Sequence, residues 1–157
     1  MTGFRRGVRL GIDVGRARVG VARCDPDGML AVPVETVPRD ARSVDRLAEI
    51  ASEYEPLEFV VGLPVNLRGS DTASTTDARD FAVSLATRTG IPVRLVDERL
   101  STVTAHAALR SSGRTQKNSR SIVDQVAAVV LLQQAIDTEK STGNPPGATV
   151  PLDEESP

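Results

Sequence analysis

The order of the predicted elements most constrains the fold of this chain. Three strand-like segments, joined by tight turns, precede any helical pattern. Residues 8–14 form a short, mostly apolar run, residues 18–23 alternate between apolar and polar side chains, and residues 30–37 follow a turn that contains Pro and Gly. Connections this short join antiparallel strands and not parallel ones. The first 37 residues therefore predict an antiparallel meander. Pro33, inside the third segment, indicates an edge strand or a bulge.

Two further strands then alternate with helices. Residues 57–64 and 91–98 are short apolar runs typical of buried strands. The helical patterns cover residues 40–54, with Asp40 as the cap, 73–89, ended by Gly90, and also 102–110 and 121–137, with a loop over 111–120. This order predicts an α/β fold with a five-stranded mixed sheet, made of the meander plus two parallel crossover strands, and helices on both faces.

The length of 157 residues predicts one domain, over residues 8–137. Residues 1–7 are expected to be a flexible N-terminus. Residues 138–157 are rich in Pro, Gly and acids and are expected to form a disordered tail. The tail carries a net charge of −3, whereas the whole chain carries −2. The other 137 residues therefore have a net charge of about +1. Any nucleic acid must therefore be bound by local basic patches and not by a uniformly basic surface.

The composition excludes several kinds of site. Aromatic residues make up 3% of the chain and Trp is absent, which disfavours a surface that binds bases by stacking. With one cysteine, Cys24, neither an internal disulfide nor a cysteine-based zinc site can form, and a disulfide between two copies stays open. No apolar run approaches 18 residues and no targeting segment is visible. We therefore expect a cytoplasmic protein that does not associate with a membrane.

Three acids stand at positions that favour a shared site. Asp13 ends the first strand and Glu98 ends the fifth, and the carboxyl ends of parallel strands lie at the same edge of a sheet. By alternation, Asp97 and Glu98 point to opposite faces, so one of them alone can join Asp13. The simpler interpretations are a turn-forming role for Asp13 and a local ion pair between Glu98 and Arg99.

Asp124 is the third acid, placed by a helical argument. It shares a stripe that should face the sheet with Ala127, Ala128, Leu131 and Ala135. An unpaired carboxylate buried there costs several kcal/mol, which a divalent cation held together with Asp13 and Glu98 would offset. Oxygen ligands without a His or Cys cluster suit Mg²⁺ or Mn²⁺, and two such ions about 4 Å apart can support phosphodiester hydrolysis. Alternatively, Asp124 interacts with the helix dipole.

Basic and polar side chains suited to phosphate contacts surround these acids. The chain has no acid between Glu98 and Asp124, and its strand ends add further candidates. The candidate nucleic-acid-binding residues are Arg16, Arg18, Asn66, Arg68, Arg99, Arg110, Arg114, Lys117 and Arg120. The alternative is an ordinary solvated surface.

Four segments, GIDVGRARVGVA, VVGLPVNLRGSD, VRLVDERLSTVTA and SIVDQVAAVVLLQ, resemble the YqgF family, also called RuvX. This RNase H-like group is described as Holliday junction resolvases and pre-16S rRNA nucleases. The resemblance implies an RNase H-like fold and a catalytic acidic triad of Asp13, Glu98 and Asp124. Related RuvC-type resolvases carry one more acid further along the last helix, where this chain has Ala127 and Ala128, so the number of metal ions stays open.

Two other functions remain open at this point. A module of this fold could bind RNA or the ribosome without catalysis. An actin-like ATPase would share Asp-Val-Gly followed by Gly-Val-Ala, although such proteins need a duplicated domain. For a nuclease, branched DNA and precursor rRNA are both candidate substrates. A resolvase makes paired cuts, which favours a homodimer, whereas an rRNA nuclease can act as a monomer.

Overall fold

A computed structural model describes residues 4–66, 68–98 and 116–151, and for residues 116–124 it describes the backbone alone. Its strands form one sheet in the order β3-β2-β1-β4-β5-β6. The antiparallel meander consists of β1 (Arg9–Val14), β2 (Arg18–Cys24) and β3 (Ala31–Pro38). The parallel strands β4 (Glu58–Leu63) and β5 (Val93–Asp97) follow, and β6 (Ala148–Thr149) pairs antiparallel with β5. The predicted α/β fold is confirmed, with six strands instead of five.

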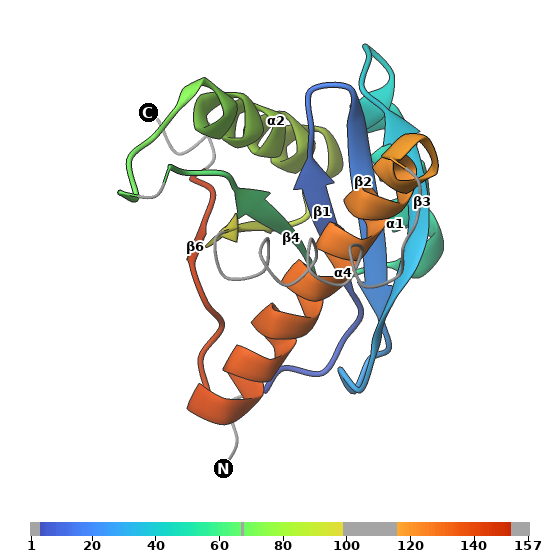
Figure 1. Cartoon of the computed structure of the whole chain (residues 1–157). Coiled ribbons are helices and arrows are strands. Elements are labelled where there is room, and N and C mark those ends of the chain that lie inside the picture. Colours follow the sequence, from blue (N-terminus) through green and yellow to red (C-terminus); the bar gives the residue numbers. More distant parts are fainter. Residues whose placement is uncertain (1–3, 67, 99–115, 152–157) are drawn as a thin grey trace, which may run out of the picture.

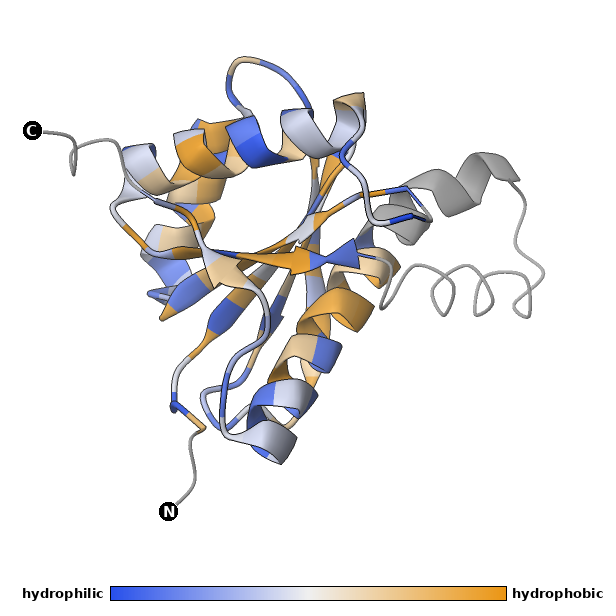
Figure 2. Ribbon diagram, turned by 90° about the vertical axis from the view of Figure 1, so that its left-hand side faces the viewer, coloured by the Kyte–Doolittle hydropathy of each residue, from blue (hydrophilic) through white to orange (hydrophobic). Residues whose placement is uncertain are grey.

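Helices cover both faces of the sheet (Figure 1). The helices α1 (Ser43–Tyr54) and α2 (Ala73–Thr89) pack on one face, over a core that includes Leu47, Phe59 and Leu85. The helix α4 (Gln116–Thr142) crosses the other face, where Leu131 and Leu132 are buried. Figure 2 shows the sheet between these two helical layers. In the described part of the chain, no helix is both long and apolar enough to cross a membrane.

Local sequence signals account for several element boundaries. Thr72 and Thr75 form a reciprocal capping box at the start of α2, and Gly90 ends that helix with φ +72°, as predicted. The expected cap at Asp40 is wrong, because α1 begins at Ser43. The backbone N–H of Asp40 donates to Ser43 Oγ, and the Asp40 carboxylate accepts from the backbone N–H of Arg42, so Asp40 shapes the turn before the helix.

The meander ends in the irregular edge strand that Pro33 predicts. On β3, Pro33 pairs with Ala22 and Glu35 pairs with Val21, so one extra residue is accommodated between them. Pro33 has no N–H group to donate to a neighbouring strand, and an edge strand tolerates this loss where the position faces solvent. The position of β3 at the edge of the sheet therefore confirms the prediction.

Both ends of the chain are more structured than expected. Helix α4 begins at Gln116, inside the predicted loop, and runs past residue 137 to Thr142; β6 and the buried Val150 follow. At the other end, Arg5 donates from its side chain to Glu58 and Glu139. The expectations for residues 1–7 and 138–157 therefore do not hold for residues 4–7 and 138–150. Residues 1–3 and 152–157, and the predicted helix 102–110, lie outside the described residues.

A buried ionic cluster explains this order. Arg9 and Glu139 are 1% and 2% exposed, and Arg9 Nη2 lies 3.1 Å from Glu139 Oε2. Arg5 joins Glu139 to Glu58 at 2.8 and 3.0 Å, and Arg94 contacts Glu58 at 3.2 Å. Burial alone would raise the pKa of Glu139, but hydrogen bonds from Arg5 and the charge of Arg9 lower it to about 2. The cluster ties the N-terminal segment and the end of α4 to the amino-terminal ends of the parallel strands.

Cys24 lies in the core between the sheet and α4. Its side chain is fully buried, and the backbone N–H of Arg9 donates to its Sγ at 3.3 Å. Burial raises the pKa of the thiol, which disfavours the reactive thiolate. An intermolecular disulfide through Cys24, left open by the sequence, is therefore incompatible with the folded chain.

Candidate active site

Asp13 lies near the carboxyl end of β1 with a glycine on each side. In β2 its partner is Gly20. In β4, Val61 pairs with the preceding residue, Ile12, so Gly62 lies on the other side of Asp13. Directly opposite residues share a face of the sheet, so neither neighbouring strand places a side chain directly beside the Asp13 carboxylate. Asp13 is half-buried, so its side chain stays accessible from the edge of the sheet.

The face that carries Asp13 is the face that α4 covers. A Cβ built on Gly11, two residues before Asp13, would lie 2.8 Å from Leu132 Cβ and 2.9 Å from the carbonyl oxygen of Ala128. The backbone of α4 therefore approaches β1 closely at this glycine. Since side chains alternate along a strand, Asp13 points to the same face as Gly11.

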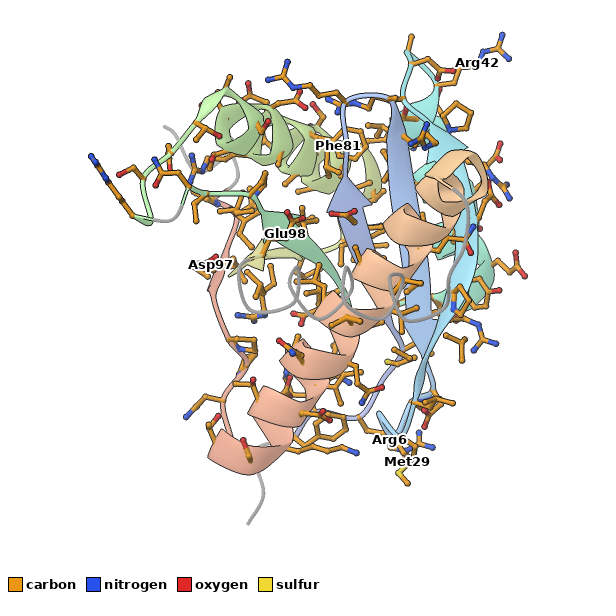
Figure 3. All side chains as sticks on the ribbon, in the orientation of Figure 1. Arg6, Met29, Arg42, Phe81, Asp97 and Glu98 are labelled. Atoms are coloured by element: carbon orange, nitrogen blue, oxygen red, sulfur yellow. The ribbon has the colours of Figure 1, made fainter. Side chains whose placement is uncertain are left out.

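Glu98 follows β5 directly and reaches the same place. Its Oε2 lies 3.1 Å from the position that a Cβ on Gly62 would occupy. Figure 3 shows the Glu98 side chain over the end of β4 and the Asp97 side chain further toward β6. Asp97 pairs with Leu63, which packs against the core under α1 and α2, so the two acids lie on opposite faces as predicted. Asp13 and Glu98 therefore flank Gly62 on one face.

The helix that carries Asp124 is anchored at the level of Asp13. The next residue, Gln125, donates from Nε2 to Thr36 Oγ1 at 2.7 Å. Thr36 pairs with Gly20, the partner of Asp13, so the anchor and Asp13 belong to the same row across the sheet. The helix stripe that contains Asp124 is buried against the sheet from the next turn onward, at Ala128, Leu131 and Ala135. The Asp124 side chain itself lies outside the described residues.

The predicted phosphate-binding residues are placed at the same end of the sheet, where they are described. Arg16 is exposed in the turn after β1, and Arg68 is exposed in the loop after β4. Arg18 begins β2, two residues before Gly20, and so lies on the face of Asp13. Asn66 shapes its own loop, because its Oδ1 accepts from the backbone N–H groups of Arg68 and Ser70, each at 2.9 Å. Its contact with nucleic acid stays a prediction.

The remaining basic candidates are described less completely. Arg99, Arg110 and Arg114 lie outside the described residues. Lys117 and Arg120 belong to α4, with backbone positions alone described, and the prediction of a loop there is wrong. Lys117 and Arg120 are therefore carried by the same helix as Asp124.

A second interaction holds the turn after Asp13, and sequence reasoning missed it. Arg39 Nη1 donates to the carbonyl oxygen of Gly15 at 2.8 Å, and both terminal nitrogens of Arg39 contact the Asp77 carboxylate, at 2.9 and 2.7 Å. The guanidinium also lies 4.8 Å from the centre of the Phe81 ring. Hydrogen bonds from Arg39 lower the pKa of Asp77, so this carboxylate stays ionised. The network fixes the turn that presents Arg16.

The described side chains alone do not complete a metal site. Among them, no group of three His, Cys, Asp or Glu side chains is close enough to hold an ion. Asp13 and Glu98 supply oxygen donors on one face of the sheet, and α4 adds the backbone position of Asp124. This donor set fits a hard divalent cation such as Mg²⁺ or Mn²⁺.

Comparisons with known proteins identify the family of the chain. Residues 7–138 match the family model described as "RuvX: Holliday junction resolvase". The chain is 56% identical, over 94% of both chains, to a protein of Clavibacter michiganensis subsp. michiganensis named "Putative pre-16S rRNA nuclease". A protein of the same name from Streptomyces coelicolor is 54% identical, with 94% of this chain and 90% of the relative covered.

Solved structures show the same fold at lower identity. The structure of T. thermophilus RuvC in complex with a Holliday junction substrate superposes with a TM-score of 0.55 at 18% identity, and it covers 88% of this chain and 98% of the RuvC chain. A second T. thermophilus RuvC structure gives a TM-score of 0.52. These likenesses show a shared fold of the RNase H-like type. With its matching family model and relatives at more than half identity, the chain belongs to the RuvX family of Holliday junction resolvases.

Proposed function

We propose that this protein is an endonuclease that hydrolyses nucleic-acid phosphodiesters with the help of Mg²⁺ or Mn²⁺. The observation that supports this most is the approach of two acids from different strands: Asp13 and Glu98 flank Gly62 on one face of the sheet. Two carboxylates brought together from different strands offer the oxygen donors that a hard divalent cation prefers. Relatives at more than half identity carry nuclease names, which agrees with this chemistry.

Each acid would have a separate task. Asp13, between two glycines, would contact both of two ions, while Glu98 and Asp124 would each hold one side. Bound cations in such a pair activate water and stabilise the leaving oxygen of an in-line displacement. The absence of a side chain at Gly62 lets the Glu98 carboxylate lie close to Asp13. Arg16 and Arg18 would contact neighbouring phosphates of the same strand.

Branched DNA and precursor rRNA are the two substrate classes that we propose. The family description favours four-way DNA junctions, and the names of the relatives favour the precursor of 16S rRNA. Cleavage of a junction by paired cuts would need two copies of the chain, so a homodimer belongs to the first alternative. Both substrates belong to the cell interior, which agrees with the expected cytoplasmic location.

A comparison of wild type with Asp13→Asn tests the proposal. Both proteins are incubated with a four-way DNA junction and with a structured precursor rRNA, with Mg²⁺ or Mn²⁺. We expect wild type to cut one of them and Asp13→Asn to lose the activity, with an unchanged circular dichroism spectrum. Asp27→Asn is a matched control, because Asp27 is exposed and pairs with Arg6 at the opposite end of the sheet.

Two results would contradict the nuclease. Cleavage by Asp13→Asn at the wild-type rate would remove the acidic site from the reaction. A wild type that binds RNA and cuts neither substrate, with binding unchanged when all three acids are neutralised, would favour the RNA-binding module without catalysis.

A further inference from the structure

The arginines of this chain are paired very unequally at the two ends of the sheet. At the amino-terminal ends of the parallel strands, Arg5, Arg9 and Arg94 all contact Glu58 or Glu139. On the helices, Arg46, Arg79 and Arg88 each form an ion pair with a nearby acid. Most described arginines therefore neutralise an acid of the chain itself and add little to the external field.

Three exposed arginines are an exception within the described residues. Arg16, Arg42 and Arg68 form no ion pair there, whereas Arg23 stacks on Tyr54 and Arg39 binds Asp77. Arg16 and Arg42 are exposed beside the turn that Arg39 fixes, and Arg68 is exposed in the loop after β4. These three guanidinium groups are available to an external anion.

All three arginines lie at the end of the sheet that carries Asp13 and Glu98. Arg16 follows β1, and Arg68 follows β4. Arg42 follows β3, which runs parallel to β1 because both strands are antiparallel to β2. Strands β3, β2, β1 and β4 are consecutive in the sheet, and strands lie about 4.8 Å apart, so the outer two are separated by about 14 Å. The unpaired arginines thus span the edge beside the acids.

Two of the acids nearby, Asp77 and Asp71, are already paired with other arginines of the chain. Asp77 is held by both terminal nitrogens of Arg39, and Arg16 lies close enough to lower its pKa further. Asp71 pairs with Arg79, and Asp40 accepts from the backbone N–H of Arg42. A hollow of about 480 Å³, lined by Arg16, Arg39, Ala73 and Asp77, lies beside the same turn.

We propose that Arg42, together with Arg16 and Arg68, forms a phosphate track for the nucleic-acid strand that flanks the cleaved bond. One guanidinium group can donate two parallel hydrogen bonds to the oxygens of one phosphate. Such contacts do not depend on the base sequence of the nucleic acid. The track runs from the start of α1, over the turn after β1, to the loop after β4. Arg42 is the new member of the track, because the residues predicted from the sequence to bind nucleic acid include Arg16 and Arg68 but not Arg42. The inference rests on the proposed nuclease function, because it assigns the track to the same substrate.

The structure offers a clean test at Arg42. Arg42 occupies the position before α1, but its side chain makes no capping hydrogen bond. Arg42→Gln therefore removes the charge without removing a helix cap. Arg46 lies one turn further on the same helix and contacts Glu35 at 2.6 Å and Glu49 at 2.9 Å, so Arg46→Gln is the matched control.

Binding is measured with metal chelated by EDTA, so that no cleavage occurs. Fluorescence anisotropy gives the affinity of each protein for a four-way DNA junction and a structured RNA over a series of KCl concentrations. We expect Arg42→Gln to reduce the magnitude of the slope of log affinity against log salt by about 1, and Arg42→Glu to reduce affinity further. Arg46→Gln should keep the wild-type slope.

The outcomes separate this inference from the nuclease function. An unchanged slope for Arg42→Gln, an equal loss for Arg46→Gln, or wild type that binds neither substrate would overturn the track. A wild type that binds with an Arg42-dependent slope but never cuts would overturn the nuclease and leave the track. A protein that cuts a substrate but has a salt slope independent of Arg42 would overturn the track and leave the nuclease function.

Discussion

Glu98 lies over Gly62, with its Oε2 3.1 Å from the position of a Cβ that Gly62 lacks. Leu131 Cδ2 is 3.2 Å from the same point, so the space beside Gly62 is closed on the side of α4. Any side chain at residue 62 would displace the carboxylate or the helix. The missing side chain therefore determines how closely Glu98 can approach Asp13.

Gly62→Ala should weaken metal-supported cleavage more than it weakens the fold. The added methyl group moves the Glu98 carboxylate, so we expect the Mg²⁺ concentration for half-maximal cleavage to rise about 10-fold. Changes to residues that orient a metal ligand typically lower metal affinity by about this factor. Metal titrations of the cleavage rate would measure this. Val60→Ile is the control: Val60 faces α4 on the same strand, two residues away, and overpacking costs about 1–3 kcal/mol there too. Equal effects of both variants on the metal requirement would contradict the positioning role of Gly62.

Gln125 and Thr36 should act as one unit in positioning α4. Their hydrogen bond of 2.7 Å joins the helix to the row of Asp13. We expect Gln125→Leu and Thr36→Val each to lower the cleavage rate about 10-fold, and the double variant to lose no more than either alone. Single-turnover kinetics on the cleaved substrate would show this. Additive losses would mean that the two residues affect the reaction separately.

Glu139 should make the free energy of unfolding depend on pH in the acidic range. Its pKa is about 2 in the folded chain, below the ordinary value of 4.5, so the unfolded chain takes up the proton first. The stabilisation is therefore complete above about pH 4.5 and is lost as the pH falls toward 2. Glu139→Gln should destabilise the protein by about 3 kcal/mol or more at pH 7, because Arg9 stays buried without its counter-charge.

Urea unfolding of wild type and Glu139→Gln at pH 7, 4 and 2.5 measures this effect. The difference in unfolding free energy should shrink as the pH falls. A constant difference would show that charge at Glu139 does not stabilise the fold, and that shape alone matters.

The Cys24 thiol should be inert in the folded protein. It is fully buried, and burial raises its pKa. We expect a thiol-reactive chromophore to label it slowly in buffer and rapidly in urea, and non-reducing electrophoresis after mild oxidation to show a monomer. A covalent dimer formed under native conditions would require β2 to open.

Features set by neighbouring residues were predictable from the sequence. The end of α2 follows from Gly90, and the edge position of β3 follows from Pro33. The shared face of Asp13 and Glu98 follows from strand order and alternation, because the parallel pairing of β1, β4 and β5 places their ends together.

Features that depend on distant partners were not predictable. Gln125 and Thr36 are 89 residues apart, and Arg9 and Glu139 are 130 residues apart. In the sequence, Glu139 belongs to a polar, acidic stretch, and its burial becomes reasonable once two arginines from the other end of the chain surround it. The same applies to Arg39, whose contacts with Gly15 and Asp77 depend on the packing of the turn against α2.

The ionic cluster also has a consequence for synthesis of the protein. Arg9 is synthesised 130 residues before its partner Glu139. Helix α4 carries both Glu139 and Asp124, so a nascent chain lacks the partner of Arg9 and the third acid until the same helix emerges. Truncated products, which end before α4, would leave Arg9 without its counter-charge and would lack the third acid of the proposed site.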